Sequence, residues 1–204
     1  VGYMFVTTTT QVWKRLYDEG KLNEAQSHFW KTKPAEELSD LEKDPDEVNN
    51  LAGSKKHQKI LDQMRKAHRE HVTKIRDVGF LPEGEIHERS KGSTPYEMGH
   101  DDKKYPFQKI HAAADMSSSM RSKDLPAITK LLDDDDSAVR YWGALGLLMQ
   151  EKAGVKKGHA KLLESLKDKS PYVRVIAAEA LGEYGSKEDI ARAVDTVGKT
   201  VDPT

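Results

Sequence analysis

The sequence predicts an α+β fold, in which a small subdomain of short antiparallel strands and helices precedes an all-α solenoid. The stretch Tyr3–Val6 is apolar and β-prone, which favours a strand. Residues 36–41 alternate polar and apolar side chains and end shortly before the chain-breaking pair Asp44-Pro45, which favours a second strand. From Leu125 onward the sequence repeats itself with an offset of 34 residues, which is typical of stacked helix pairs.

These observations divide the chain into three predicted parts. Residues 1–79 form the subdomain, residues 80–105 form a long ordered loop or strap, and residues 106–204 form helical repeats. The first residue is Val1, and no basic region of a signal peptide precedes the apolar start. We therefore expect the chain to be part of a longer protein, and we expect the repeats to continue beyond Thr204.

Composition excludes several classes of function. The 204 residues are 33% charged and 36% hydrophobic, with a net charge of −1 and no basic stripe, so we expect no nucleic-acid partner. No apolar run approaches the roughly 18–20 residues of a membrane span, so we expect no membrane partner. The absence of cysteine excludes disulfides, zinc–thiolate sites and cysteine nucleophiles.

The predicted subdomain begins with two short helices. Residues 11–19 place apolar side chains on one helical face, and Gly20 ends that helix. Asn23 and Gln26 have the spacing of a capping box, which begins a second helix that runs to about Trp30. The aromatic residues Trp13, Tyr17, Phe29 and Trp30 have two interpretations, a ligand-binding platform or the core of the subdomain, and we favour the core.

The stretch Glu36–Gly53 predicts a strand, a tight turn and a short helix. Asp44 can cap the helix, Pro45 suits its first position, and Glu47 completes a capping box. This stretch resembles the C-terminal signature of the sulfatase family, E-L-Y-D-L-x-x-D-P-x-E-x-x-N-L-A, with Ser39 in place of the tyrosine. The matching residues are Glu37, Leu38, Asp40, Leu41, Asp44, Pro45, Glu47, Asn50, Leu51 and Ala52.

The resemblance extends upstream through Val12–Leu41, which looks like one bacterial subgroup of the formylglycine-dependent arylsulfatases, related to heparan-N-sulfatases. It implies that this region buttresses a missing N-terminal catalytic domain and helps to wall the substrate cleft. The parent protein would be exported or periplasmic and would hydrolyse sulfate esters of carbohydrates, using calcium and formylglycine as cofactors.

The family's catalytic motif is missing from this chain. The Cys/Ser-x-Pro-x-Arg pattern that yields formylglycine is approached only at Ser93–Glu97, where Glu97 stands in place of the arginine. We therefore expect no catalytic residue, no metal ligand and no cofactor in this chain, and no activity from it alone.

A long helix is predicted over residues 54–78, with Gly79 at its end. It carries His57, His68 and His71, and the pair His68/His71 has a spacing that could hold a metal ion. No third ligand follows at a suitable distance, so we favour a solvated helix face.

Residues 80–105 show little periodicity and contain several glycine and polar residues. Loops of this length are often functional. His87, Arg89 and His100 are the residue types that would contact an anionic sugar, so they are the predicted substrate-binding residues. The alternative is a strap that packs through the apolar side chains of Ile86, Tyr96, Met98 and Tyr105, and we favour the strap.

The repeats in residues 125–204 resemble the HEAT-repeat family. The pattern V-R-x-x-A-A-x-A-L is complete at Val173–Leu181 and partial at Val139–Leu147. Val139 and Val173 should pack inward, while Arg140 and Arg174 should tie adjacent turns through Asp134 and Asp168.

The aspartates 133–136 lack the spacing of a calcium loop, so we interpret them as turn and capping residues. HEAT repeats commonly present concave surfaces to partners. The alternative function is therefore a protein-interaction module without enzymatic activity.

Overall fold

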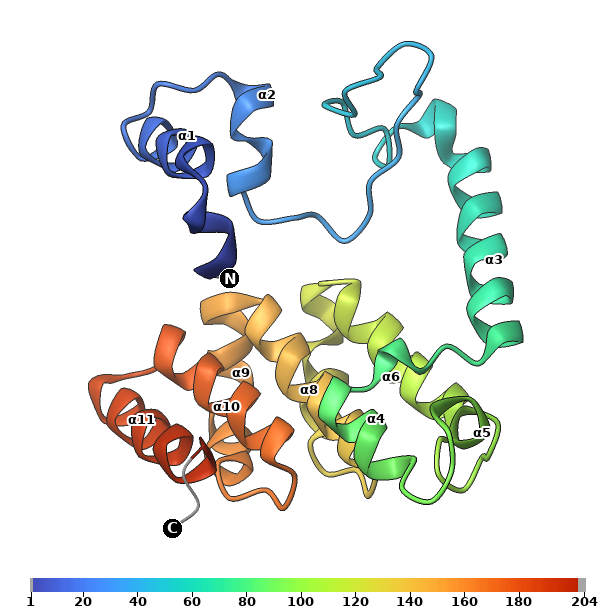
Figure 1. Cartoon of the computed structure of the whole chain (residues 1–204), viewed down its shortest axis with the longest axis vertical. Helices are drawn as coiled ribbons and strands as arrows, with labels where there is room; N and C mark the ends of the chain where they lie inside the picture. The colour runs from blue at the N-terminus through green and yellow to red at the C-terminus, as the bar shows by residue number, and fades with distance from the viewer. Residues whose placement is uncertain (1, 202–204) are drawn as a thin grey trace. The chain divides into compact units, whose positions relative to one another are not determined.

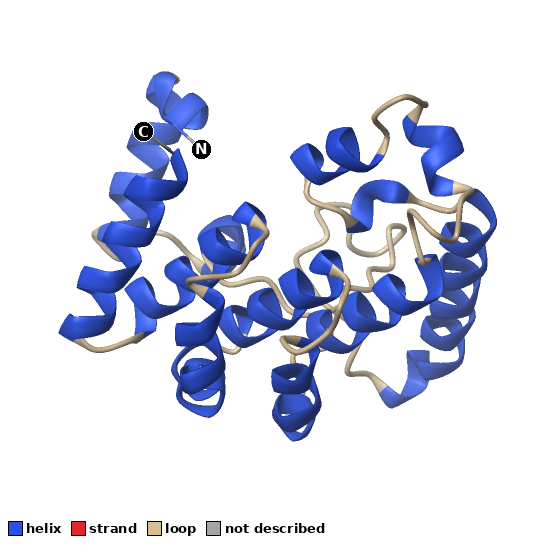
Figure 2. Cartoon of the chain, turned by 90° about the horizontal axis from the view of Figure 1, so that it is seen from below, coloured by secondary structure: helices blue, strands red, loops and turns tan. Residues whose placement is uncertain are grey.

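The computed structural model of the chain describes residues 2–201, and its regular elements are helices (Figures 1 and 2). No strand occurs among these residues, so the predicted α+β class with its antiparallel strands is wrong, and the described chain is all-helical. The backbone divides into two compact units, Val1–Lys66 and Ala67–Thr204, which we describe separately.

The first unit opens with a 3-10 helix, η1 (Gly2–Val6), where the sequence predicts a strand, and continues with α1 (Thr8–Asp18). A strand would offer its carbonyl groups to a neighbouring strand. Here Thr7 Oγ1 donates to the carbonyl of Met4 at 3.2 Å, and Gln11 Nε2 donates to the carbonyl of Phe5 at 2.7 Å. Because nearby side chains satisfy these groups, the segment needs no sheet.

An aromatic cluster holds α1 to the next short helices, α2 (Glu24–Ser27) and η2 (His28–Trp30). The rings of Trp13, Phe29 and Trp30 pack on one another with centroids 4.9–5.1 Å apart. The capping box at Asn23 is confirmed, because Gln26 N donates to Asn23 Oδ1 at 2.8 Å and Asn23 N donates to Gln26 Oε1 at 3.1 Å. None of these rings is buried, and Phe29 is 44% exposed, so the cluster joins the short helices without forming the buried core that the sequence favoured.

The stretch Glu36–Gly53 forms a closed loop that contains neither the predicted strand nor the predicted helix. Asn50 Nδ2 donates to the carbonyl of Glu36 at 2.9 Å, and Leu38 N donates to Asn50 Oδ1 at 3.1 Å. The side-chain amide of Asn50 thus takes the place of a partner strand. The helix after Asp44 fails because Glu47 adopts a left-handed conformation with φ of 53°, which a right-handed helix cannot include.

The long predicted helix is present as η3 (Lys55–His57) and α3 (Gln58–Ile75), so that α3 begins in the first unit and ends in the second. Arg76, with φ of 54°, takes the left-handed position after the helix that the sequence assigns to Gly79. The Arg76 guanidinium then binds the following segment, because Nε donates to the carbonyl of Gly99 at 2.6 Å and Nη2 contacts Asp102 at 2.7 Å.

Three short helices lie between residues 78 and 99: η4 (Val78–Phe80), α4 (Glu83–Arg89) and α5 (Pro95–Gly99). Met98 and Tyr105 are fully buried, and Ile86 packs at the edge of the same cluster. Tyr96 is exposed instead. This part of the chain therefore packs through three of its four apolar anchors.

The rest of the second unit is a two-layer solenoid (Figure 1). Helices α6 (Phe107–Ser118), α8 (Ser137–Met149) and α10 (Pro171–Tyr184) pack in one row. Helices α7 (Leu125–Leu131), α9 (Glu151–Ser165) and α11 (Lys187–Val201) pack on that row, and η5 (Ser122–Asp124) precedes α7. Val139 and Val173 are buried in this core, as the repeat pattern predicts.

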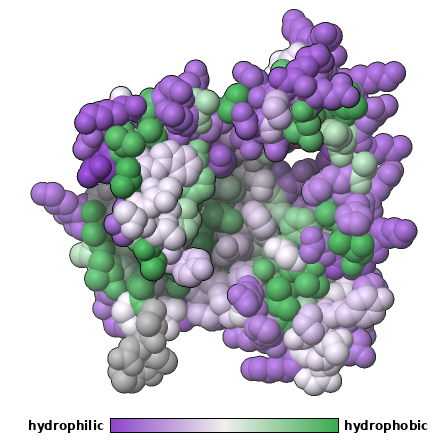
Figure 3. Space-filling view, turned by 45° about the horizontal axis from the view of Figure 1, so that its top comes forward, coloured by the Kyte–Doolittle hydropathy of each residue, from purple (hydrophilic) through white to green (hydrophobic). Residues whose placement is uncertain are grey.

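The surface combines charged and apolar groups. Figure 3 shows hydrophilic side chains over much of one face, with apolar patches between them. The exposed apolar side chains include Tyr3 and Val6 in the first unit and Ile190 and Val194 in the second.

Candidate functional site

Arg140 is the buried polar centre of the repeat array. Its Nε and Nη2 contact the two carboxylate oxygens of Asp168 in the next turn at 2.7 and 2.9 Å. Its Nη1 donates to the carbonyls of Asp134 and Asp135 in its own turn at 2.8 and 2.9 Å. The prediction that Arg140 ties adjacent turns is confirmed, with Asp134 contributing through its backbone rather than its carboxylate.

Arg174 occupies the equivalent place one repeat later but has different partners. Its Nη1 donates to the carbonyl of Asp168 at 2.8 Å, which repeats the bond that Arg140 makes to Asp134. Its Nε binds the hydroxyl of Thr200 at 3.1 Å, where Arg140 binds a carboxylate. Within residues 2–201, no ion pair neutralises the Arg174 guanidinium.

Arg89, a predicted substrate-binding residue, lies in a buried cluster that joins α4 to the start of α8. Its guanidinium contacts Glu85 Oε1 at 2.5 Å and both carboxylate oxygens of Asp136 at 2.7 and 3.0 Å. Burial by itself would lower the pKa of Arg89, but the hydrogen bonds to the two carboxylates raise it above its usual value. Ser137 also donates to Glu85, whose second oxygen is buried without a partner.

His87 and His100, the other two predicted substrate-binding residues, are both exposed. The ring of His100 lies 4.3 Å from that of Tyr96, and its Nδ1 is 2.8 Å from the Tyr96 carbonyl. In the described part of the chain, no hydrogen bond or ring contact joins His87, Arg89 and His100. A sulfate group could reach Arg89 only after its guanidinium had left Asp136.

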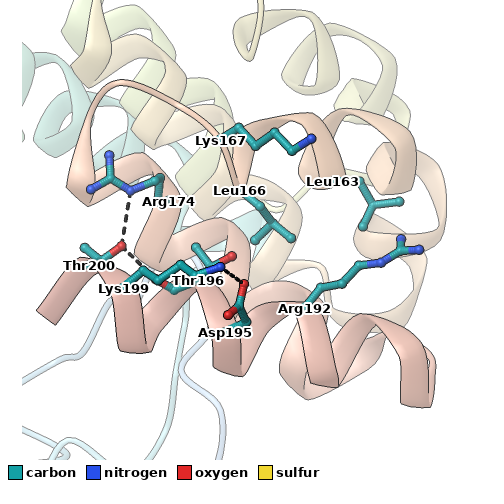
Figure 4. A pocket seen from close by; sticks show the side chains of 9 residues that line it. All are labelled: Leu163, Leu166, Lys167, Arg174, Arg192, Asp195, Thr196, Lys199 and Thr200. Carbon is teal, nitrogen blue, oxygen red and sulfur yellow. Dashed lines mark hydrogen bonds and ion pairs between the residues drawn. The ribbon is translucent and has the colours of Figure 1, made fainter. Parts of the chain in front are cut away.

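A cavity of about 750 Å³ lies between α9, α10 and α11, and Figure 4 shows the side chains around it. At one end of α11, His159 Nε2 on α9 contacts Asp189 Oδ2 at 2.9 Å. The cavity lies toward the C-terminal end of α11, between this helix, α9 and α10. The lining residues are Leu163, Leu166, Lys167, Arg174, Arg192, Asp195, Thr196, Lys199 and Thr200.

The lining of this cavity is strongly basic. It holds four cationic side chains and one carboxylate, that of Asp195, which contacts Lys199 at 2.6 Å. Arg192 lies 4.0 Å from Asp189, and no ion pair to Lys167 occurs within residues 2–201. A concave site with an excess of cationic and hydroxyl donors is suited to a ligand that carries oxyanions.

Neither the structural role of Asn50 nor this cavity is among the features predicted from the sequence. Asn50 binds three backbone groups, because its Oδ1 accepts from the N–H groups of Leu38 and Ala52 while its Nδ2 donates to Glu36. A comparison of the repeats could have indicated the cavity, because Thr196 and Thr200 stand 34 residues after the larger, apolar Leu162 and Leu166.

Neither a metal-binding cluster nor a membrane-spanning helix is found among residues 2–201. Within residues 2–201, no group of three or more histidine, cysteine, aspartate or glutamate residues could hold a metal ion. His68 and His71 lie exposed on α3. Asp136 caps α8 by accepting from Ala138 N at 2.8 Å, consistent with the capping interpretation. None of the described helices combines the length and the apolar character needed to cross a membrane.

Comparison with known proteins supports both resemblances. The model of the family described as HEAT repeats matches residues 125–204. This part of the chain therefore consists of HEAT-like repeats. Over 87 residues the chain is 40% identical to a protein named "Ulvan-active sulfatase" from Formosa agariphila, a match that covers 42% of this chain and 15% of that protein. No solved structure matches the chain.

Proposed function

We propose that this chain is a non-catalytic C-terminal part of a sulfatase, joined to HEAT-like repeats that serve as an interaction module. The observation that carries the proposal is the 40% identity to the ulvan-active sulfatase over 87 residues. The resemblance of the stretch Glu36–Gly53 to the C-terminal sulfatase signature also supports it. On this proposal, the parent protein is exported and hydrolyses sulfate esters of a carbohydrate with formylglycine and calcium supplied by its N-terminal domain.

The geometry agrees with a supporting role for the first unit. The signature residues Asp44 and Asn50 close a loop by binding backbone groups. On this proposal, their role is to fix the conformation of the loop rather than to bind a substrate. Tyr3 and Val6 are largely exposed, at 89% and 76%. Exposed apolar side chains of this kind suit burial against a partner surface, and we propose the catalytic domain as that partner. His87, Arg89 and His100 stay predicted contacts to the sulfated carbohydrate.

The test begins with the DNA that precedes the codon of Val1. We expect a Cys/Ser-x-Pro-x-Arg motif within several hundred codons upstream, in the same reading frame. The longer product should hydrolyse an arylsulfate, whereas the 204-residue chain should not. An upstream region without the motif would overturn the sulfatase assignment, and hydrolysis by the 204 residues alone would overturn their non-catalytic role.

The alternative is a HEAT-repeat interaction module with no enzyme attached, and the match over residues 125–204 favours it. It predicts a stable protein partner for the repeats and no sulfatase motif upstream. Sequencing upstream therefore separates the two proposals before any activity is measured.

A further inference from the structure

The cavity between α9, α10 and α11 differs from the equivalent place one repeat earlier. There, Leu162 and Leu166 are buried and fill the space beside the core. At the positions 34 residues later, α11 carries Thr196 and Thr200, which are only half-buried and line the cavity. Replacing two leucines with threonines removes apolar filling from this place. The hydroxyl of Thr200 donates to the carbonyl of Thr196 and accepts from Arg174, so it helps to position that guanidinium.

The charges change in the same direction. Asp133 of the earlier turn pairs with Lys161 at 2.7 Å, and the two signs are exchanged at the positions 34 residues later, Lys167 and Asp195. Arg192 and Lys199 line the cavity where the earlier repeat has Gly158 and Ser165. Two cationic side chains have thus been added where the earlier repeat has a glycine and a serine. Arg140 is neutralised by Asp168. Within residues 2–201 the equivalent Arg174 contacts the hydroxyl of Thr200, and Asp202, which stands 34 residues after Asp168, lies outside the described residues.

Figure 4 shows that these donors come from three separate helices or their ends. Lys167 follows the C-terminus of α9, Arg174 lies on α10, and Lys199 lies on α11. Side chains on separate packed elements keep their spacing when a ligand enters, so little reorganisation is needed for binding. The volume, about 750 Å³, is within the range of small-ligand sites.

We propose that this cavity binds the sulfate group and adjoining sugar of a sulfated saccharide. Lys167 and Arg174 bind the sulfate oxygens through charge-assisted hydrogen bonds, and the side chain of Thr196 faces the sugar ring. The choice of sulfate over phosphate rests on the proposed function, whereas the choice of an oxyanion rests on the cavity alone.

The experiment is calorimetric titration of the 204-residue chain at about 0.15 M salt, where exposed charges act over only about 8 Å. The probes are a sulfated disaccharide, the same disaccharide without sulfate, its phosphorylated counterpart, and inorganic sulfate. We expect the sulfated disaccharide to bind, the unsulfated one not to bind, and inorganic sulfate to bind at least about tenfold more weakly.

The test variant is Lys167→Asp, which restores the charge of the earlier repeat at an exposed position. The matched control is Lys157→Asp, which makes the same change in net charge on exposed α9 surface that does not line the cavity. We expect K167D to weaken binding about tenfold, the loss of one charge-assisted contact, and K157D to leave it within about twofold. Equal losses in the two variants would show non-specific attraction and overturn the site.

The remaining outcomes are also decisive. Absence of binding overturns the site, tighter binding of the phosphorylated disaccharide overturns the sulfate assignment, and equal binding of inorganic sulfate overturns the saccharide contact. The titration needs no catalytic activity, so its failure leaves the sulfatase proposal standing. Conversely, if no sulfatase motif is encoded upstream but K167D still weakens binding and K157D does not, the proposed function fails while the anion site remains.

Discussion

At the scale of single residues, the two repeat arginines show how equivalent sequence positions take different partners. Arg140 is 6% exposed and is enclosed by the carboxylate of Asp168 and two carbonyl groups, so its charge is satisfied inside the protein. The hydrogen bond to Asp168 raises the pKa of Arg140. Arg174 keeps the carbonyl contact, and within residues 2–201 the partner of its Nε is the neutral hydroxyl of Thr200.

This difference predicts unequal costs for the same substitution. Arg140→Met leaves Asp168 buried without its partner and should lower the free energy of unfolding by about 3–5 kcal/mol. Arg174→Met removes neutral hydrogen bonds at a half-buried position and should cost about 1 kcal/mol. Urea denaturation followed by circular dichroism measures both values. Equal costs would show that the carboxylate contact does not distinguish the two sites.

The same ion pair gives a prediction about acid. Burial alone would raise the pKa of Asp168, but the hydrogen bond from Arg140 and one from Ser170 N–H outweigh burial and lower it. The stability that this lowered pKa provides is fully present above the unfolded value of about 3.9 and is lost as the pH falls through the lower folded value. The difference in Tm between the natural chain and Asp168→Asn should therefore be constant at pH 5–7 and shrink below about pH 4. Calorimetry that finds the difference unchanged at low pH would contradict this mechanism.

At the scale of elements, close approach of α8 and α9 depends on glycine. A Cβ placed on Gly154 would lie 2.0 Å from the carbonyl oxygen of Leu147, and one on Gly158 would lie 2.2 Å from the Leu147 side chain. No side chain fits at 2.0 Å from a backbone atom, so any larger residue at Gly154 must push the two helices apart. Gly198 on α11 has nothing within 4 Å of the same position.

We therefore expect opposite results from two glycine substitutions. Gly154→Ala should destabilise the chain by about 1–3 kcal/mol through overpacking. Gly198→Ala should stabilise it by up to about 1 kcal/mol, because alanine has the higher helix propensity. Thermal unfolding of the two variants measures the difference. A neutral Gly154→Ala would mean that α9 can shift without loss of packing.

The helices of the solenoid could be predicted from the sequence, because a 34-residue repeat and apolar spacing report on packing that is local in the chain. The predicted strands are wrong, because a strand needs a partner strand and the periodicity of the sequence does not specify one. At Tyr3–Val6 the partner groups are the side chains of Thr7 and Gln11, and at Leu38 the partner is mainly the amide of Asn50.

The candidate sites differ in the same way, because some of their contacts follow from the repeat and others depend on long-range folding. The link between Arg140 and the next turn follows from the repeat register, so the sequence predicts it. Arg89 has the residue type of an anion ligand, but its proximity to Asp136 depends on folding that joins positions 47 residues apart. The cavity depends on three helices, and only a comparison of leucine with threonine between repeats indicates it.

At the scale of the whole molecule, the two units differ in how much apolar surface they bury. Among the described residues up to Lys66, the buried hydrophobic side chains are Leu38 and Leu61. The second unit holds two large buried clusters. One is centred on α8 and α10, and the other is made of residues between Val72 and Val139. Because burial of apolar side chains supplies most of the stability, the two units should open with very different free energies.

Hydrogen exchange of the intact chain, followed by mass spectrometry, measures this difference directly. Amide groups of α8 and α10 should exchange only through global or near-global unfolding, whereas those of α1 and α2 should exchange through low-energy local opening, faster by at least about a hundredfold. If α1 and α2 are instead as protected as α8, the first unit is stabilised by contacts beyond its own core. In a longer chain that includes the proposed catalytic domain, exchange at η1 and α1 should be slower than in the 204-residue chain. The reason is that Tyr3 and Val6 are the apolar side chains that such a domain would cover.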